Sequence, residues 1–212
     1  MQLTPDGSLL VRSAMSMSRL LDSERSVDAT ETARLVRLTL GGDPAAFEQI
    51  ILRHEHRIMA VAARLLGARE DVKDVAQEVF LRAFKYLHRL DVQKPVEPWL
   101  MRITVNVCRD AARSRQRRLA TFVDVDEPEQ IDESPDPYAG LARKQEQLIL
   151  QKALETLPEK ERLAIVLRDV EGLSTAEVAA ILQSSETTVR SQVSRGRLKL
   201  KAAIDRLLGA KP

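Results

Sequence analysis

Cysteine, aromatic residues and long apolar runs are scarce in this chain of 212 residues, and each scarcity excludes a class of structure. Cys108 is the only cysteine, so no intrachain disulfide and no cluster of thiolate metal ligands can form, which suits a reducing cytoplasm. Aromatic residues make up 3% of the chain and alternating β-branched runs are few. We therefore expect an all-α fold rather than an extensive sheet.

Membrane and secretion signals are also missing from the sequence. No run approaches the roughly 18 apolar residues that a membrane-spanning helix needs, so we expect no membrane insertion. Arg12 and Arg19 lie near the N-terminus, but no apolar segment accompanies them, and a secretory signal is not expected. We expect the protein to act in the cytoplasm.

Motifs for catalysis or cofactor binding are lacking as well. His54 and His56 flank Glu55, but two metal ligands on one helical face need a spacing of three or four residues. Gly41 and Gly42 suit a turn before a helix rather than a phosphate-binding loop, and no Ser/His/Asp set has a recognisable nucleophile elbow. We predict that the protein is not an enzyme and needs neither a metal nor a cofactor.

Charge is distributed in blocks that the formal net charge of +2 conceals. Residues 43–118 carry 15 Lys/Arg against 10 Asp/Glu, whereas residues 119–140 hold seven acids and no base. This pattern predicts two small helical domains, residues 43–118 and 141–212, joined by an acidic extended linker. Residues 1–42 are expected to be a partly disordered N-terminal extension. Three prolines favour an extended linker over a helix: Pro128, Pro135 and Pro137.

The first domain is expected to contain three helices. The first is capped by Asp43, with Pro44 at its first position, and runs to Gly67. The second covers about residues 70–88, and the third begins at Trp99 and ends in an arginine cluster near residue 118. Pro95 and Pro98 predict a loop over residues 91–98. Apolar residues of the first two helices recur at helical spacing and should face inward: Phe47, Ile50, Ile51, His54, Ile58, Val61 and Leu65, then Val72, Val75, Val79, Phe80, Ala83 and Leu87.

The second domain is expected to end in a helix-turn-helix. It opens with a helix over residues 141–156 and a second from Pro158 to about Gly172. Ser174 and Glu177 then form a capping box, and Leu173 is placed to pack on Val178. A polar break over residues 183–185 follows, and Ser185 is the predicted cap of the last helix. The inward positions of that helix are Val189, Val193, Gly196, Leu200 and Ile204.

The outward face of the last helix is basic. At about 100° per residue it presents Ser191, Ser194 and Arg195, with Arg190 and Arg197 on one flank and Gln192 and Lys199 on the other. Residues 186–211 carry seven Lys/Arg against two Asp/Glu. Such a face can enter a major groove, where arginine bonds guanine edges and lysine contacts phosphates. The alternative is a surface hairpin with a merely solvated basic face.

The first domain offers two further polar surfaces. Asp74, Gln77 and Glu78 share the outward face of the second helix and suit either solvent or a hydrogen-bonding partner helix. The third helix bears a tryptophan followed by polar residues: Trp99, Arg102, Asn106, Arg109, Asp110 and Arg113. Aromatic and arginine side chains beside a loop can capture unpaired bases, although Trp99 could equally be core filler.

Three segments together resemble the extracytoplasmic-function group of bacterial RNA polymerase sigma factors. They are DVAQEVF at residue 74, PWLMRITVNVCRD at residue 98, and LPEKERLAIVLRDVEGLSTAEVAAILQSSETTVRSQVSRGRLKL at residue 157. The resemblance extends from about Ala45 to Leu208, and the joint match of both ends at this separation is specific. It implies a sigma region 2 bundle over residues 43–118 and a sigma region 4 helix-turn-helix over residues 141–212.

The resemblance also implies a set of partners. Asp74, Gln77 and Glu78 would dock on the clamp coiled coil of the largest subunit of core RNA polymerase, and the second domain would reach the flap. The loop of residues 90–98 would hold the melted minus-ten strand of promoter DNA, together with Trp99, Arg102, Asn106, Asp110 and Arg113. The last helix would read the minus-thirty-five duplex through Arg190, Ser191, Ser194, Arg195, Arg197 and Lys199. The acidic linker would thread towards the active-site and RNA-exit channels, and an anti-sigma factor is an expected partner.

Four positions depart from the common family pattern. Gln183 and Thr187 stand where glycine is common, Gln192 where arginine is common, and Gly196 where alanine is usual. The preferred upstream sequence therefore cannot be transferred from relatives. The main competing reading is a two-domain helix-turn-helix regulator that does not dock on core polymerase. That reading needs a receiver or ligand-binding domain, and residues 43–118 offer neither.

Overall fold

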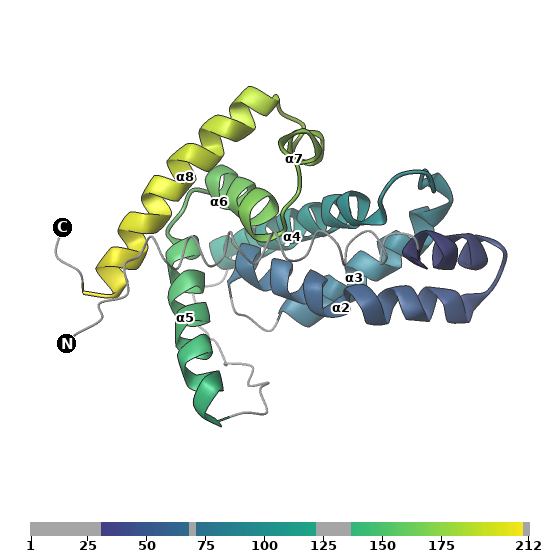
Figure 1. The fold of residues 1–212 in the computed structure, drawn as a ribbon, viewed down its shortest axis with the longest axis horizontal. Coiled ribbons are helices and arrows are strands. Elements are labelled where there is room, and N and C mark those ends of the chain that lie inside the picture. Colours follow the sequence, from purple (N-terminus) through teal and green to yellow (C-terminus); the bar gives the residue numbers. More distant parts are fainter. Residues whose placement is uncertain (1–30, 68–70, 122–136, 210–212) are drawn as a thin grey trace. The chain divides into compact units, whose positions relative to one another are not determined.

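The computed structural model describes residues 31–67, 71–121 and 137–209, and these residues form two compact helical units. All regular elements among them are helical, so the expectation of an all-α fold is confirmed. The described part of the first unit covers residues 31–121, and that of the second covers residues 137–209 (Figure 1). None of the described helices combines the length and apolar character needed to cross a bilayer.

Three long helices form the first unit: α2 (Pro44–Leu66), α3 (Asp71–Tyr86) and α4 (Val96–Thr121). Asp43 caps α2 through Oδ1, which accepts a hydrogen bond from the Ala45 amide at 2.9 Å, and Gly67 ends it with a φ of +88°. These are the predicted signals, because an Asp side chain satisfies a free helix amide and glycine adopts positive φ without strain. The predicted inward residues of α2 and α3 are buried, except Ile51, which is half-buried.

Residues 31–40 add a fourth helix to this unit, within the segment that we expected to be an N-terminal extension. Leu35 and Val36 of this helix are only 1% and 0% exposed. Their burial shows that the first unit begins before residue 43. Residues 1–30 lie outside the described residues.

The expected loop before α4 is shorter than residues 91–98. A single 3-10 turn, η1 (Leu87–Arg89), follows α3, and α4 begins at Val96, so Pro98 and Trp99 both lie in its first turn. Pro98 fits there because the first four amides of a helix have no intrahelical acceptor, and a missing N–H costs nothing. Trp99 therefore does not open the helix, as the sequence suggested, but follows its start by three residues.

Both ends of the expected linker are helical. Helix α4 continues to Thr121, and α5 (Pro137–Glu155) begins at the proline that we expected to keep the linker extended. Pro137 occupies the first helical position, where its fixed φ is favourable. All seven linker acids fall within residues 122–136, outside the described residues.

The second unit contains α5, α6 (Glu159–Ile165), the π-helical segment η2 (Val166–Val170), α7 (Thr175–Leu182) and α8 (Glu186–Leu207). Helix α8 packs against α5, α6 and α7. In η2 the Glu171 amide donates to the Val166 carbonyl, five residues back, at 2.9 Å. The core of this unit is aliphatic, and Leu154, Ile165, Leu167 and Ile204 are among its fully buried side chains.

Candidate nucleic-acid interface

The helix-turn-helix is built from the capping signals that the sequence predicts. Ser174 Oγ accepts from the Glu177 amide at 3.2 Å, and Glu177 Oε2 accepts from the Ser174 amide at 2.7 Å. Ser185 caps α8, accepting from the Thr188 amide at 3.1 Å. Each cap satisfies helix amides that would otherwise lack a partner, so α7 and α8 have defined starts.

Gln183 makes the turn between α7 and α8. Its φ of 53° and ψ of 49° are left-handed, and it is the one non-glycine residue with positive φ among those described. Its amide donates to the Ala179 carbonyl and closes α7. The turn is therefore left-handed at a residue that carries a Cβ, at a cost that glycine would not bear.

The predicted inward face of α8 is confirmed. Val189, Val193, Leu200 and Ile204 are at most 7% exposed, and Gly196 is buried between them. A Cβ on Gly196 would lie 2.8 Å from Cγ1 and 3.3 Å from Cδ1 of Ile165. Glycine at this position thus permits α6 to approach α8 closely.

The outward face of α8 presents Arg190, Ser191, Ser194 and Arg195, all exposed. Arg190 donates through Nη2 to Glu186 Oε2 at 2.6 Å, one turn earlier on the same helix. This pair is exposed on both sides, so it costs little to exchange for a phosphate. The four residues lie on the N-terminal half of α8, the half that a recognition helix inserts into a major groove.

The structure differs from the expectation at three residues that we placed on the flanks of this face, because one is buried and two are paired with acidic side chains. Gln192 is 8% exposed and its Oε1 has no hydrogen-bond partner among the described residues, so it faces the protein interior rather than solvent. Arg197 donates from Nε and Nη2 to the two oxygens of Asp169, at 2.8 and 2.6 Å. Hydrogen bonding to Asp169 raises the pKa of Arg197. Lys199 Nζ donates to Oε1 of the buried Glu161 at 2.9 Å.

On α3, Asp74 and Gln77 are exposed as predicted, whereas Glu78 is half-exposed. Glu78 Oε1 accepts from Arg82 Nε at 2.6 Å, and Arg82 Nη1 donates to Asp110 Oδ2 of α4 at 2.9 Å. Hydrogen bonds to Asp110 and Glu78 raise the pKa of Arg82. Arg82 therefore links Glu78 of α3 to Asp110 on the polar face of α4.

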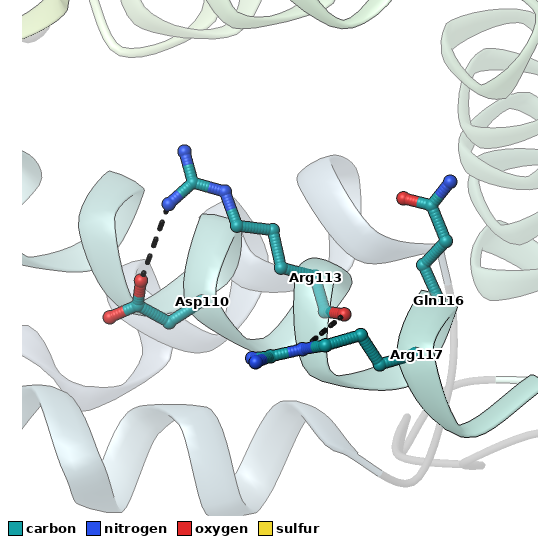
Figure 2. A pocket seen from close by; sticks show the side chains of 4 residues that line it. All are labelled: Asp110, Arg113, Gln116 and Arg117. Atoms are coloured by element: carbon teal, nitrogen blue, oxygen red, sulfur yellow. Dashed lines mark hydrogen bonds and ion pairs between the residues drawn. The ribbon is translucent and has the colours of Figure 1, made fainter.

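The polar face of α4 is largely solvent-accessible. Arg102, Asn106, Asp110 and Arg113 are exposed, and Trp99 is half-buried. Arg113 Nη1 lies 3.9 Å from Asp110 Oδ1, and Arg117 Nε donates to the Arg113 carbonyl at 3.4 Å (Figure 2). Asp110 and Arg113, together with Gln116 and Arg117, line a hollow of about 610 Å³. A surface of this composition can hold the backbone of a nucleic acid.

Sequence reasoning missed four residues around these surfaces. Arg82 follows Glu78 by four residues on one helix, and this spacing predicts their ion pair. Gln116 follows Arg113 at helical spacing and could have been added to the α4 face in the same way. Glu161 and Asp169 lie 38 and 28 residues from the cations that they bind, and no local pattern indicates such pairs.

Two family models match the chain, one in each unit. The model described as Sigma-70 region 2 matches residues 50–118, and the model described as Sigma-70, region 4 matches residues 147–200.

Similar proteins are sigma factors. The chain is 35% identical over 180 residues to RNA polymerase sigma factor NccH of Alcaligenes xylosoxydans xylosoxydans, covering 84% of this chain and 96% of that protein. It is 32% identical over 170 residues to the ECF RNA polymerase sigma-E factor of Escherichia coli K12, covering 77% and 88%.

Two solved structures with similar folds are protein complexes, one of them of a sigma factor with its anti-sigma factor. The chain matches RpoE of Bartonella quintana, solved with the anti-sigma factor NepR, with a TM-score of 0.63 and 25% identity, over 75% of this chain and 96% of that one. It matches CnrH, solved with the cytosolic domain of CnrY, with a TM-score of 0.57 and 30% identity, over 83% and 98%.

Region 2 in one helical unit and region 4 in the other define a transcription initiation factor. The chain belongs to the sigma-70 family, and its relatives place it in the extracytoplasmic-function (ECF) group. It is thus an alternative sigma factor, which binds core RNA polymerase and directs initiation at specific promoters. The alternative, a helix-turn-helix regulator that acts without core polymerase, is excluded because the first unit of this chain matches sigma region 2.

Proposed function

We propose that residues 43–118 of this sigma factor dock on core polymerase and hold the melted promoter, and that residues 141–212 bind the upstream duplex. The observation that carries the proposal is the exposed row on α8 that contains Arg190, Ser191, Ser194 and Arg195. Arginine fork geometry matches the O6 and N7 acceptors of guanine, and the two serines are small enough to let the helix approach the groove floor.

We propose that the basic residues of α8 have different roles in DNA binding and in stability. Arg195 is 61% exposed at its side chain and reads a base edge, whereas Arg197 is bonded to Asp169 and stabilises the second unit. Lys199 contacts phosphate and keeps part of its charge compensated by Glu161. Arg197 therefore contributes less to DNA binding than its place in the sequence suggests.

The polymerase contact is proposed to lie on α3. Asp74 and Gln77 are exposed acceptors on one face, and Glu78 adds a half-exposed carboxylate. Together they suit a partner helix rich in donors, such as the clamp coiled coil of the largest subunit. The second unit would contact the flap, and the acidic linker of residues 119–140 would thread through the enzyme.

The minus-ten contact is proposed to lie on α4 and the short loop before it. Asn106, Arg102 and Arg113 supply amide and guanidinium donors for bases and phosphates, and half-buried Trp99 offers an aromatic ring for stacking. Asp110, on the same face of α4, accepts a hydrogen bond from Arg82 of α3.

Regulation by an anti-sigma factor is also part of the proposal. RpoE was solved with an anti-sigma factor and CnrH with the cytosolic domain of CnrY, and this chain shares their fold. We propose that the protein acts in the cytoplasm in a stress or envelope response, and that it has no catalytic activity of its own.

A promoter library transcribed in vitro tests the proposal. Purified core RNA polymerase should initiate from a distinct subset of promoters only when the full chain is added. Transcripts from that subset should share one upstream and one minus-ten motif. Identical transcript sets with and without the chain would contradict the proposal.

A further inference from the structure

A buried carboxylate lies beneath the exposed face of α8. Glu161, in the first turn of α6, has a side chain only 10% exposed. Lys199 Nζ lies 2.9 Å from its Oε1 and 2.8 Å from its Oε2, and Arg195 Nε lies 3.8 Å from Oε1. One carboxylate therefore attracts two cations that lie one turn apart on α8.

Gly196, next to Arg195, lies against α6. A Cβ at this position would lie 2.8 Å from Cγ1 of Ile165, which is too close, and 3.4 Å from the Glu161 carbonyl oxygen, which is an ordinary contact distance. Glycine therefore avoids a clash with Ile165 at the end of α6 and allows α6, which carries Glu161, to pack closely on α8. It stands where alanine is usual in the family that this sequence resembles.

The geometry at Arg195 favours recognition of a base by the two terminal amino groups of its guanidinium. Its Nε lies 3.8 Å from Glu161 Oε1, an ion-pair distance longer than a hydrogen bond, and within the described part of the chain this is the one ion pair found for Arg195. The two terminal amino groups remain available as a fork for guanine O6 and N7. Restricting a long side chain before binding lowers the conformational entropy lost on binding.

We propose that Glu161 is a positioning residue that sets the base specificity of α8 by orienting Arg195. The proposal rests on the assignment of Arg195 to base reading in the proposed function. It differs from a purely structural role, because Glu161 also withholds positive charge of Lys199 from the DNA backbone. Neutralising the carboxylate should therefore raise nonspecific affinity and lower the ratio of specific to nonspecific affinity.

The substitution Glu161→Gln tests this combined effect on nonspecific affinity and on the affinity ratio. The experiment uses holoenzyme formed from core polymerase and the full chain. Its ligands are duplexes that the wild-type holoenzyme selects from a library randomised in the upstream promoter element. We expect affinity for scrambled duplexes to rise and the ratio of selected to scrambled affinity to fall by about two- to fivefold, the range set by ion pairs with one exposed partner. The lost discrimination should concentrate at one base pair. Thermal unfolding of each variant checks that the second unit stays folded.

Asp205→Asn is the matched control, because Asp205 pairs with Lys201 at 2.8 Å further along α8. It makes the same change in charge and should raise both affinities without changing their ratio. Glu161→Asp is a second variant that keeps the charge but withdraws it by one methylene. It should lower the ratio while leaving scrambled affinity nearly unchanged, and it keeps the test available if the glutamine variant does not fold.

Arg195→Ala separates the two levels of the proposal. If it lowers the ratio but neither Glu161 variant does, the positioning role is refuted and the base-reading role stands. If Arg195→Ala leaves the ratio unchanged, the base-reading role fails and the positioning role fails with it. In the Arg195→Ala background, Glu161→Gln should have no further effect on the ratio.

Discussion

Arg197 and Asp169 form a two-point ion pair across the second unit, with Nη2 to Oδ1 at 2.6 Å and Nε to Oδ2 at 2.8 Å. The Asp169 side chain is 9% exposed and that of Arg197 is 40% exposed. The pair ties α8 to η2, the segment that leads into the helix-turn-helix. A basic residue of the helix that we propose to bind DNA therefore stabilises the fold.

Arg197→Ala should lower the free energy of unfolding of the second unit. The substitution leaves a nearly buried carboxylate without its guanidinium, and we expect a loss of about 1–2 kcal/mol, since one partner is partly hydrated. Urea denaturation measures the loss. Arg190→Ala is the control, because its pair with Glu186 is exposed, and it should change stability by less than about 0.5 kcal/mol. Equal losses for both variants would show that Arg197 has no special structural role.

Gln183→Gly should stabilise the second unit. The left-handed backbone at this position costs a residue with a Cβ about 1 kcal/mol or more, whereas glycine adopts it without that strain. We expect a gain of about 0.5–1 kcal/mol in urea denaturation after the greater flexibility of glycine in the unfolded chain is included. Gln183→Ala removes the same side chain but keeps a Cβ, so it should bring no gain. A gain from alanine equal to that from glycine would point to the side chain rather than to backbone strain.

Cys108 should be chemically inert in the folded protein. It is 3% exposed, and burial raises its pKa from 9.0 to about 12. At about pH 8.5 a thiol reagent should react with urea-unfolded protein and not with folded protein. Because the folded-state pKa is the higher one, the stability that the thiol contributes is present below about pH 9 and is lost as pH rises towards 12.

The pH dependence can be isolated with Cys108→Ala. Stability of the wild type should fall more steeply than that of the variant between about pH 9 and pH 11, because other groups titrate equally in both. Parallel curves, or rapid modification of the folded wild type, would contradict the burial of the thiol.

Most helices could be predicted from sequence because their signals are local, whereas the helix over residues 31–40, the start of α4 at Val96 and several side-chain positions could not. The spacing of Val189, Val193 and Leu200 defines the buried face of α8, and this face is confirmed. Gln192 lies at the edge of that face, and helical periodicity alone does not decide whether an edge position is covered. Its burial depends on the elements packed against α8. In the same way, the partner of Arg197 lies 28 residues earlier, beyond any helical repeat.

If α3 carries the polymerase contact, as we propose, its exposed acidic side chains can be removed without loss of fold. Asp74→Ala with Glu78→Ala should weaken core binding in a pull-down, because two acceptors for the partner helix are lost. Stability should fall by no more than about 1 kcal/mol, because the ion pair of Glu78 with Arg82 is partly exposed and Arg82 keeps its bond to Asp110. Glu48→Ala removes an exposed acid from α2 instead and should leave core binding unchanged. Full core affinity in the double variant would remove this face from the interface.

The polar face of α4 predicts a defect confined to promoter melting. Asn106 and Arg113 are both exposed, and the Arg113 side chain is 72% exposed, so their replacement by alanine should leave the first unit folded. Base capture must offset a few kcal/mol of unstacking and unpairing, and lost contacts therefore shift the balance towards closed duplex. We expect Asn106→Ala with Arg113→Ala to preserve core binding and upstream duplex binding, yet to abolish permanganate-reactive thymines near the start site. Initiation from a pre-melted promoter should be partly restored, because the unpairing cost is then already met. Normal melting by the double variant would assign strand capture to other residues.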